Sequence, residues 1–75
     1  MDHAQFLNHL DELFEKPPGS LRGSDRLEDL EGWDSVALIN FLAMVDERYG
    51  RRLSPRDIGR CETVDDLFSL VEKAG

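Results

Sequence analysis

The sequence predicts an all-α fold: a small four-helix bundle of three main helices and one short helix, with a long first loop. Three observations favour this fold class. Four segments repeat apolar residues at the spacing of one helix face. Stretches that contain proline, glycine or serine separate these segments. No segment combines strand-like alternation with turn residues at its ends. We expect one domain over residues 1–75. Domains usually comprise about 100–200 residues, so a chain of 75 residues has no room for two.

The first helix is predicted from about Asp2 to Glu15, with Asp2 as a plausible N-cap. Proline and glycine at positions 17–19 end it firmly, because proline cannot continue a helix. One stripe collects its apolar residues, which are Phe6, Leu7, Leu10, Leu13 and Phe14.

A long connection from Lys16 to Asp34 follows. It exceeds the usual length of a helix–helix turn, about 2–8 residues. It also contains four large apolar residues, which a solvated linker would not need: Leu21, Leu27, Leu30 and Trp33. We therefore expect a loop that is pinned to the core, with a turn of helix at Asp25–Leu30.

The second helix is predicted from Ser35 to about Tyr49, with Gly50 at its C-terminal cap. Either Asp34 or Ser35 can supply the N-cap. Its buried stripe is expected to contain Leu38, Phe41, Leu42, Val45 and Tyr49.

Two further helices complete the bundle. Ser54-Pro55 is a strong start signal for a short helix that ends by Gly59 or Arg60. Thr63 then caps the last helix, whose inner face contains Val64, Leu67, Phe68 and Val71.

The core can contain only a few layers of side chains in a chain of this length. We expect the best buried side chains to be Phe6, Leu10, Leu13, Leu38, Phe41, Leu42, Val45, Tyr49, Leu67, Phe68 and Val71. Leu27, Leu30 and Cys61 are expected beneath the loops.

Composition excludes several classes of protein. There are 16 acidic and 9 basic residues, a net charge of −7, which argues against general nucleic-acid binding. The single cysteine, Cys61, excludes an internal disulfide and favours a reducing, cytoplasmic setting. The N-terminus does not resemble a signal peptide. The longest apolar stretch, Val36–Ile39, is too short to cross a membrane. We also expect the protein to be a monomer.

Catalytic and metal sites find little support in the sequence. A zinc site needs about four nitrogen or sulfur ligands, and the chain offers only Cys61, His3 and His9. The two histidines are six positions apart, so they lie on different helix faces. Ser35 has no evident general base. A lone cysteine is more often a small buried hydrophobe than a reactive thiol. We therefore predict neither catalytic nor metal-binding residues.

Basic residues cluster near the end of the second helix. Five arginines lie between positions 48 and 60, with Asp57 as the only acid among them: Arg48, Arg51, Arg52, Arg56 and Arg60. They form either a solvated face or a docking patch for an anionic partner or ligand, because arginine suits bidentate contacts with carboxylate and phosphate.

The stretch Gly32-Trp33-Asp34-Ser35-Val36 is the most informative one. An Asp-Ser pair before a helix is by itself usually only a cap. Here the length, acidity, helix order, long first loop and helix-heading serine together resemble the acyl carrier proteins. The family's attachment motif is an Asp-Ser-Leu-like triplet. The segment Thr63-Val64-Asp65-Asp66-Leu67 also looks like the family's entry to the last helix. The resemblance covers nearly the whole chain.

The resemblance implies a carrier and not an enzyme. Ser35 would be esterified by 4′-phosphopantetheine, which a separate phosphopantetheinyl transferase takes from coenzyme A. The thiol of this arm would hold an acyl group as a thioester, loaded by a ligase or acyltransferase. Asp34 would support the cap geometry and the transferase with its metal. The helix N-terminus favours the negative charge of the phosphodiester.

Departures from the family pattern suggest a dedicated biosynthetic pathway. Val36 replaces the usual leucine or methionine, and Asn40 replaces a common glutamate. The expected docking face of the second helix thus carries one charge and consists of Val36, Ala37, Asn40, Ala43 and Glu47. Arg56 and Arg60 would add the main electrostatic contact. The cargo can be acyl or aminoacyl. An unmodified helical protein-interaction module is the alternative function.

Overall fold

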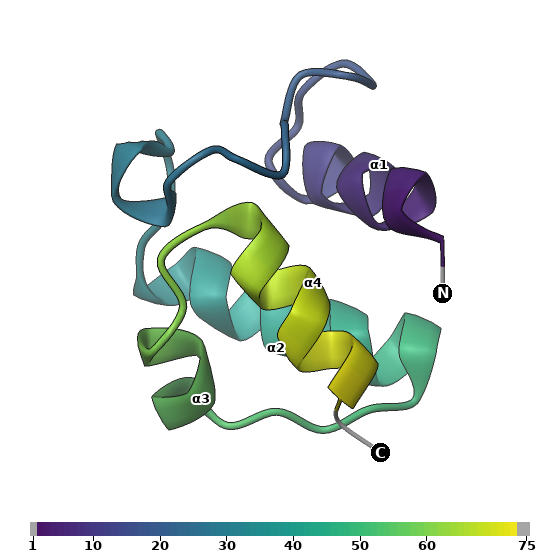
Figure 1. The fold of residues 1–75 in the computed structure, drawn as a ribbon, viewed down its shortest axis with the longest axis vertical. Helices are drawn as coiled ribbons and strands as arrows, with labels where there is room; N and C mark the ends of the chain where they lie inside the picture. Colours follow the sequence, from purple (N-terminus) through teal and green to yellow (C-terminus); the bar gives the residue numbers. More distant parts are fainter. Residues whose placement is uncertain (1, 74–75) are drawn as a thin grey trace.

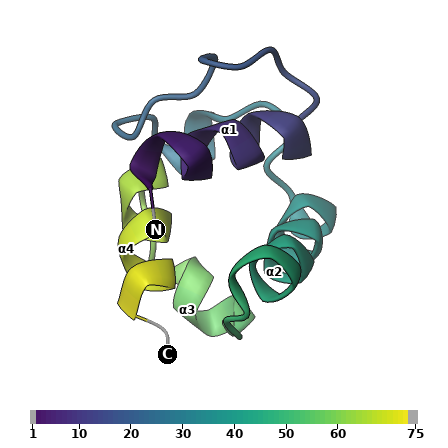
Figure 2. The ribbon, with the colours of Figure 1, turned by 90° about the vertical axis from the view of Figure 1, so that its right-hand side faces the viewer.

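The structure is a computed structural model that describes residues 2–73 and has the predicted all-α fold. Its elements are α1 (His3–Leu13), a 3₁₀ turn η1 (Leu27–Asp29), α2 (Ser35–Tyr49), α3 (Pro55–Gly59) and α4 (Val64–Lys73). The four helices surround a common interior, and the connection between α1 and α2 arches over α1 (Figures 1 and 2).

Local capping sets the helix bounds largely where the sequence predicts them. The Asp2 carboxylate accepts a hydrogen bond from the Ala4 N–H at 2.9 Å, and α2 has the predicted bounds with Gly50 as its C-cap. Ser54 forms a reciprocal capping box with Asp57 at the start of α3. The first helix is shorter than predicted, because the chain turns after Leu13 and Glu15 adopts a positive φ of 57°.

Thr63 caps α4 as predicted. Its hydroxyl accepts from the Asp66 N–H at 3.2 Å, while the Asp66 carboxylate accepts from the N–H groups of Glu62 and Thr63 at 2.9 and 3.1 Å. These two backbone hydrogen bonds favour the ionised carboxylate and lower the pKa of Asp66. The cap of α4 is therefore formed by local interactions.

The core differs in part from the predicted one. Phe6, Leu10, Phe41, Val45, Leu67, Val71 and Leu27 are buried as expected. Seven of the residues expected in the core are only half-buried at its edge: Leu13, Leu38, Leu42, Tyr49, Phe68, Leu30 and Cys61. Four residues outside the expected set are buried: Leu21, Met44, Ile58 and Val64. On α2 the difference arises because the helix is rotated about its axis relative to the predicted orientation. The helix turns Phe41, Met44 and Val45 inward at the i, i+3, i+4 spacing, so Leu42 lies beside the buried stripe.

Asp11 is a charged residue inside this core, with a side chain only 1% exposed. Its two carboxylate oxygens accept hydrogen bonds from the Leu21 N–H at 3.0 Å and the Gly19 N–H at 2.9 Å. The contact ties the long connection to α1 and buries Leu21. Asp11 looks like an ordinary polar helix residue in the sequence, so this role could not be predicted from it.

A second anchor joins the same connection to the start of α4. The Leu27 N–H donates to the Glu62 carbonyl at 2.8 Å, and the Asp65 N–H donates to the Gly23 carbonyl at 2.9 Å. A Cβ at position 23 would lie 2.1 Å from the exposed Asp65 carboxylate, so a larger residue there would require this side chain to move. The prediction of a loop pinned to the core is thus confirmed, and its helical turn is η1.

The Asp11 anchor leads to a stability prediction. In Asp11→Asn the amide group has a single acceptor oxygen, so the Leu21 or Gly19 N–H faces a donor. We expect the free energy of unfolding to fall by about 1–3 kcal/mol, the usual cost of an unsatisfied buried polar group.

Urea denaturation measures the effect, and Glu12→Gln is the matched control. It removes the same charge from the neighbouring residue but loses only the exposed ion pair with Arg48, worth up to about 1 kcal/mol. Equal unfolding midpoints for the two variants would show that the Asp11 contacts do not stabilise the fold.

Candidate functional site

The head of α2 presents Ser35 to solvent. Asp34, and not Ser35, is the N-cap, because its carboxylate accepts from the Ala37 N–H at 2.9 Å. Ser35 is the first residue of the helix and is exposed. Its hydroxyl makes no hydrogen bond within residues 2–73. The neighbouring aspartate therefore does the capping and leaves the serine oxygen accessible.

Residues 32–34 hold this head in place. Gly32 has a φ of +88°, a conformation that side-chain-bearing residues rarely adopt, and it reverses the chain before the helix. Trp33 is half-buried, with its ring 6.1 Å from that of Phe14 and 6.3 Å from that of Phe41. The indole thus anchors the segment to α1 and α2 directly before Asp34.

Backbone donors at the same place suit a negative charge. The N–H groups of Ser35 and Val36 meet no acceptor in the described part of the chain. They point along a helix of 15 residues, whose dipole places partial positive charge at this end. A phosphate ester on the serine oxygen therefore fits the residues present, because free N–H groups and an exposed hydroxyl meet at one point.

An open groove lies beside the head, between the end of α1 and the first turns of α2. Its volume is about 250 Å³. Leu13 and Phe14 contribute apolar surface from α1 and the turn after it, while Glu15 and Glu31 add carboxylates. Three residues of the predicted docking face line the groove from α2, namely Val36, Ala37 and Asn40. These three are thus brought together next to Ser35.

The remaining docking residues lie on two elements. Ala43 and Glu47 are exposed further along α2, while Arg56 is exposed on α3 and Arg60 is exposed at its C-cap. Ile39 was not part of the predicted docking face, yet it is 63% exposed, close to the 62% of Val36. Its position three residues after Val36 was the available signal, since residues at this spacing share a helix face.

Cys61 and the two histidines lie in separate surroundings. Cys61 is half-buried, and desolvation, reinforced by the nearby Asp66 and Asp57 carboxylates, raises the pKa of its thiol. His3 contacts Asp65 at 2.7 Å, whereas His9 contacts the Tyr49 hydroxyl. Within residues 2–73 no three potential metal ligands come together. No helix in that range is long and apolar enough to cross a membrane.

Comparison with known proteins identifies the family. The family described as a phosphopantetheine attachment site matches residues 4–71, which is nearly all of the described chain. Carrier domains of this kind are not catalysts, and the match decides against an unmodified interaction module. Searches of curated proteins and of solved structures found no match. The chain therefore belongs to the phosphopantetheine-attachment family, as an acyl-carrier-type protein that bears covalent 4′-phosphopantetheine and works with a phosphopantetheinyl transferase and pathway enzymes.

Proposed function

We propose that residues 1–75 act as one carrier domain, with the phosphopantetheine arm on Ser35. The arm holds an acyl or aminoacyl group as a thioester and presents it to the enzymes of a dedicated biosynthetic pathway in the cytoplasm. One observation carries the proposal. Asp34 caps α2 through the Ala37 N–H, so the Ser35 hydroxyl is exposed at the positive end of the helix.

The other serines lack this combination. The Ser20 hydroxyl donates to the Pro17 carbonyl at 2.6 Å, and the Ser54 hydroxyl accepts from the Asp57 N–H at 3.2 Å. Ser24 lies in the long connection and Ser69 lies within α4. Ser35 alone combines an accessible hydroxyl with the first position of a long helix and a capping neighbour.

The attachment site is tested by mass spectrometry after incubation with coenzyme A and a broad-specificity transferase. Ser35→Ala should lose the phosphopantetheine adduct completely. Its free energy of unfolding should change by less than about 1 kcal/mol, because the cap is Asp34. Ser69→Ala removes an exposed hydroxyl from α4 and should be fully modified. An adduct on the Ser35→Ala protein would assign the arm to another residue.

A carrier needs one reactive thiol, which is the thiol at the end of the arm. The raised pKa of Cys61 keeps its thiol protonated at neutral pH. Because the thiolate is the nucleophile, Cys61 is a poor competitor for the cargo. Burial of Cys61 thus supports selective loading of the arm.

The unmodified protein should therefore react slowly with iodoacetamide at neutral pH. The folded-state pKa is raised, so the rate should keep rising about tenfold per pH unit beyond about pH 8.5, where an ordinary thiol levels off. The same chain unfolded in concentrated urea is the control and should level off earlier. Coincident pH profiles for the folded and unfolded chains would contradict the burial of the thiol.

Docking close to Ser35 is proposed to use the outward face of α2, from Val36 and Ala37 through Asn40 and Ala43 to Glu47. This face is mostly neutral, so shape and apolar contact should dominate over electrostatic attraction. Val36 is the exposed apolar residue next to Ser35, and it also lines the groove.

Val36→Asp should lower the transferase kcat/KM by about tenfold, a loss of roughly 1.4 kcal/mol. The control Asn8→Asp adds the same charge at an exposed position of α1 and should react like the parent protein. Equal rates for Val36→Asp and Asn8→Asp would move the docking surface away from the head of α2.

A further inference from the structure

The charge of this protein is divided sharply along the chain. Residues 48–60 contain five arginines and one aspartate, a net charge of +4. The whole chain carries −7, so the remaining residues carry −11. An acidic protein that gathers most of its arginines in one short segment has, in principle, many acids available to neutralise them.

The fold leaves these arginines without such partners. Within residues 2–73 only Arg48 of this group forms an ion pair, with Glu12 at 3.2 Å, and Arg51, Arg52, Arg56 and Arg60 form none. Asp57 lies in the middle of the group, but its carboxylate accepts from the Ser54 N–H in the capping box. The one acid within this segment is thus engaged in helix capping.

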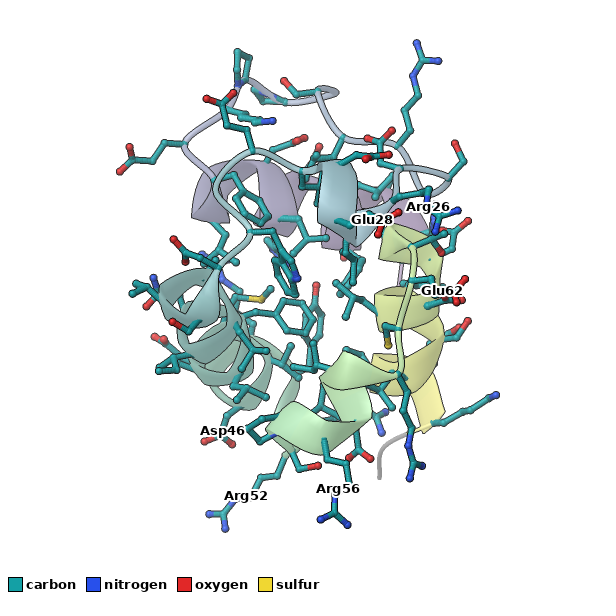
Figure 3. The ribbon with its side chains drawn as sticks, turned by 90° about the vertical axis from the view of Figure 1, so that its left-hand side faces the viewer. Arg26, Glu28, Asp46, Arg52, Arg56 and Glu62 are labelled. Carbon is teal, nitrogen blue, oxygen red and sulfur yellow. The ribbon has the colours of Figure 1, made fainter. Side chains whose placement is uncertain are left out.

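Three of the unpaired arginines are exposed on or beside α3, and we call Arg52, Arg56 and Arg60 the arginine surface. Arg52 and Arg56 both point away from the body of the molecule, at the opposite end from Arg26 and Glu28 (Figure 3). The short α3 packs against α2, which exposes Ile39 on its outer side. The helix that carries exposed charge therefore contacts the helix that carries an exposed apolar side chain.

We propose that the arginine surface docks a partner protein through a bounded patch of carboxylates, with the exposed Ile39 of α2 as an apolar contact. Guanidinium groups match carboxylates in bidentate geometry. An extended polyanion fits poorly, because the other −11 charges of the chain repel a nucleic acid or an anionic membrane. A local acidic patch avoids this repulsion. The proposal rests on the proposed function only in that the partner is one of the pathway enzymes.

The test uses two amphipathic helical peptides of equal length, one with leucine and glutamate and the other with leucine and lysine. Each is added to the phosphopantetheinylated protein, and backbone amide shifts are followed by NMR at several salt concentrations. The glutamate peptide should shift residues 52–60 and Ile39. Its Kd should rise at least about tenfold between low and high salt, because screening shortens the range of charge interactions.

Charge reversal supplies the matched variants. Arg52→Glu with Arg56→Glu should weaken the glutamate peptide at least about tenfold at low salt. Arg22→Glu with Arg26→Glu makes the same change of four charge units in the long connection and should bind the peptide like the parent protein. Equal losses in both double variants would reduce the effect to net charge and overturn the proposal.

Other anions complete the experiment. We also test a DNA duplex, a phosphatidylserine vesicle and free glutarate. If one of them shifts the same residues with equal or higher affinity, the proposal is overturned. The partner would then be a polyanion, a membrane or a carboxylate-bearing cargo, respectively. Absence of any shift with the glutamate peptide would make the arginines a solvated face. Failure here is distinguishable from failure of the proposed function. The adduct on the parent protein is measured without any peptide, and unmodified Ser35→Ala, which cannot receive the arm, should still bind the glutamate peptide.

Discussion

The buried carboxylate of Asp11 holds the long connection between α1 and α2 in place against α1. A chain of 75 residues has a small core, yet a long connection joins its first two main helices. Asp11 accepts from two backbone N–H groups of that connection, at Gly19 and Leu21. A buried charge is tolerated only when hydrogen bonds replace its hydration. The two contacts therefore supply that replacement and fix the path of the connection.

The consequences reach the head of α2. Once the connection lies over α1, hydrogen bonds from Leu27 and Asp65 join it to the start of α4, and Trp33 can pack between Phe14 and Phe41. Trp33 directly precedes the capping Asp34. The exposure of the Ser35 hydroxyl thus depends on contacts made along the whole connection. A carrier needs a firmly placed attachment point, because partner enzymes must find the arm at the same place in every cycle.

Charge has different roles at different places in the molecule. Asp2, Asp34, Asp57 and Asp66 act locally, each by accepting backbone N–H groups at the start of a helix. Exposed ion pairs such as Arg26–Glu28 at 3.1 Å add little stability. Arg52, Arg56 and Arg60 beside α3 do neither, since they form no ion pair within residues 2–73 and the acid in their own segment, Asp57, is engaged in a cap. Charge that stabilises nothing within the chain remains available for recognition.

The sequence by itself determined the helices and the head of α2. Their starts depend on residues within three or four positions, as at Asp2, Ser54-Pro55 and Thr63, so local chemistry suffices to predict them. The Asp34-Ser35 pair was recognisable for the same reason, although only the tertiary structure decided which of the two is the cap.

Tertiary structure decided what depends on distant residues. The burial of Asp11 requires a connection that returns over α1, and the inward turn of Met44 in place of Leu42 depends on how α2 packs against the other helices. The exposure of Ile39 and the absence of ion pairs at Arg52, Arg56 and Arg60 within residues 2–73 likewise depend on tertiary packing. Periodicity specifies which residues share a helix face, but only packing decides how far that face is rotated toward the core.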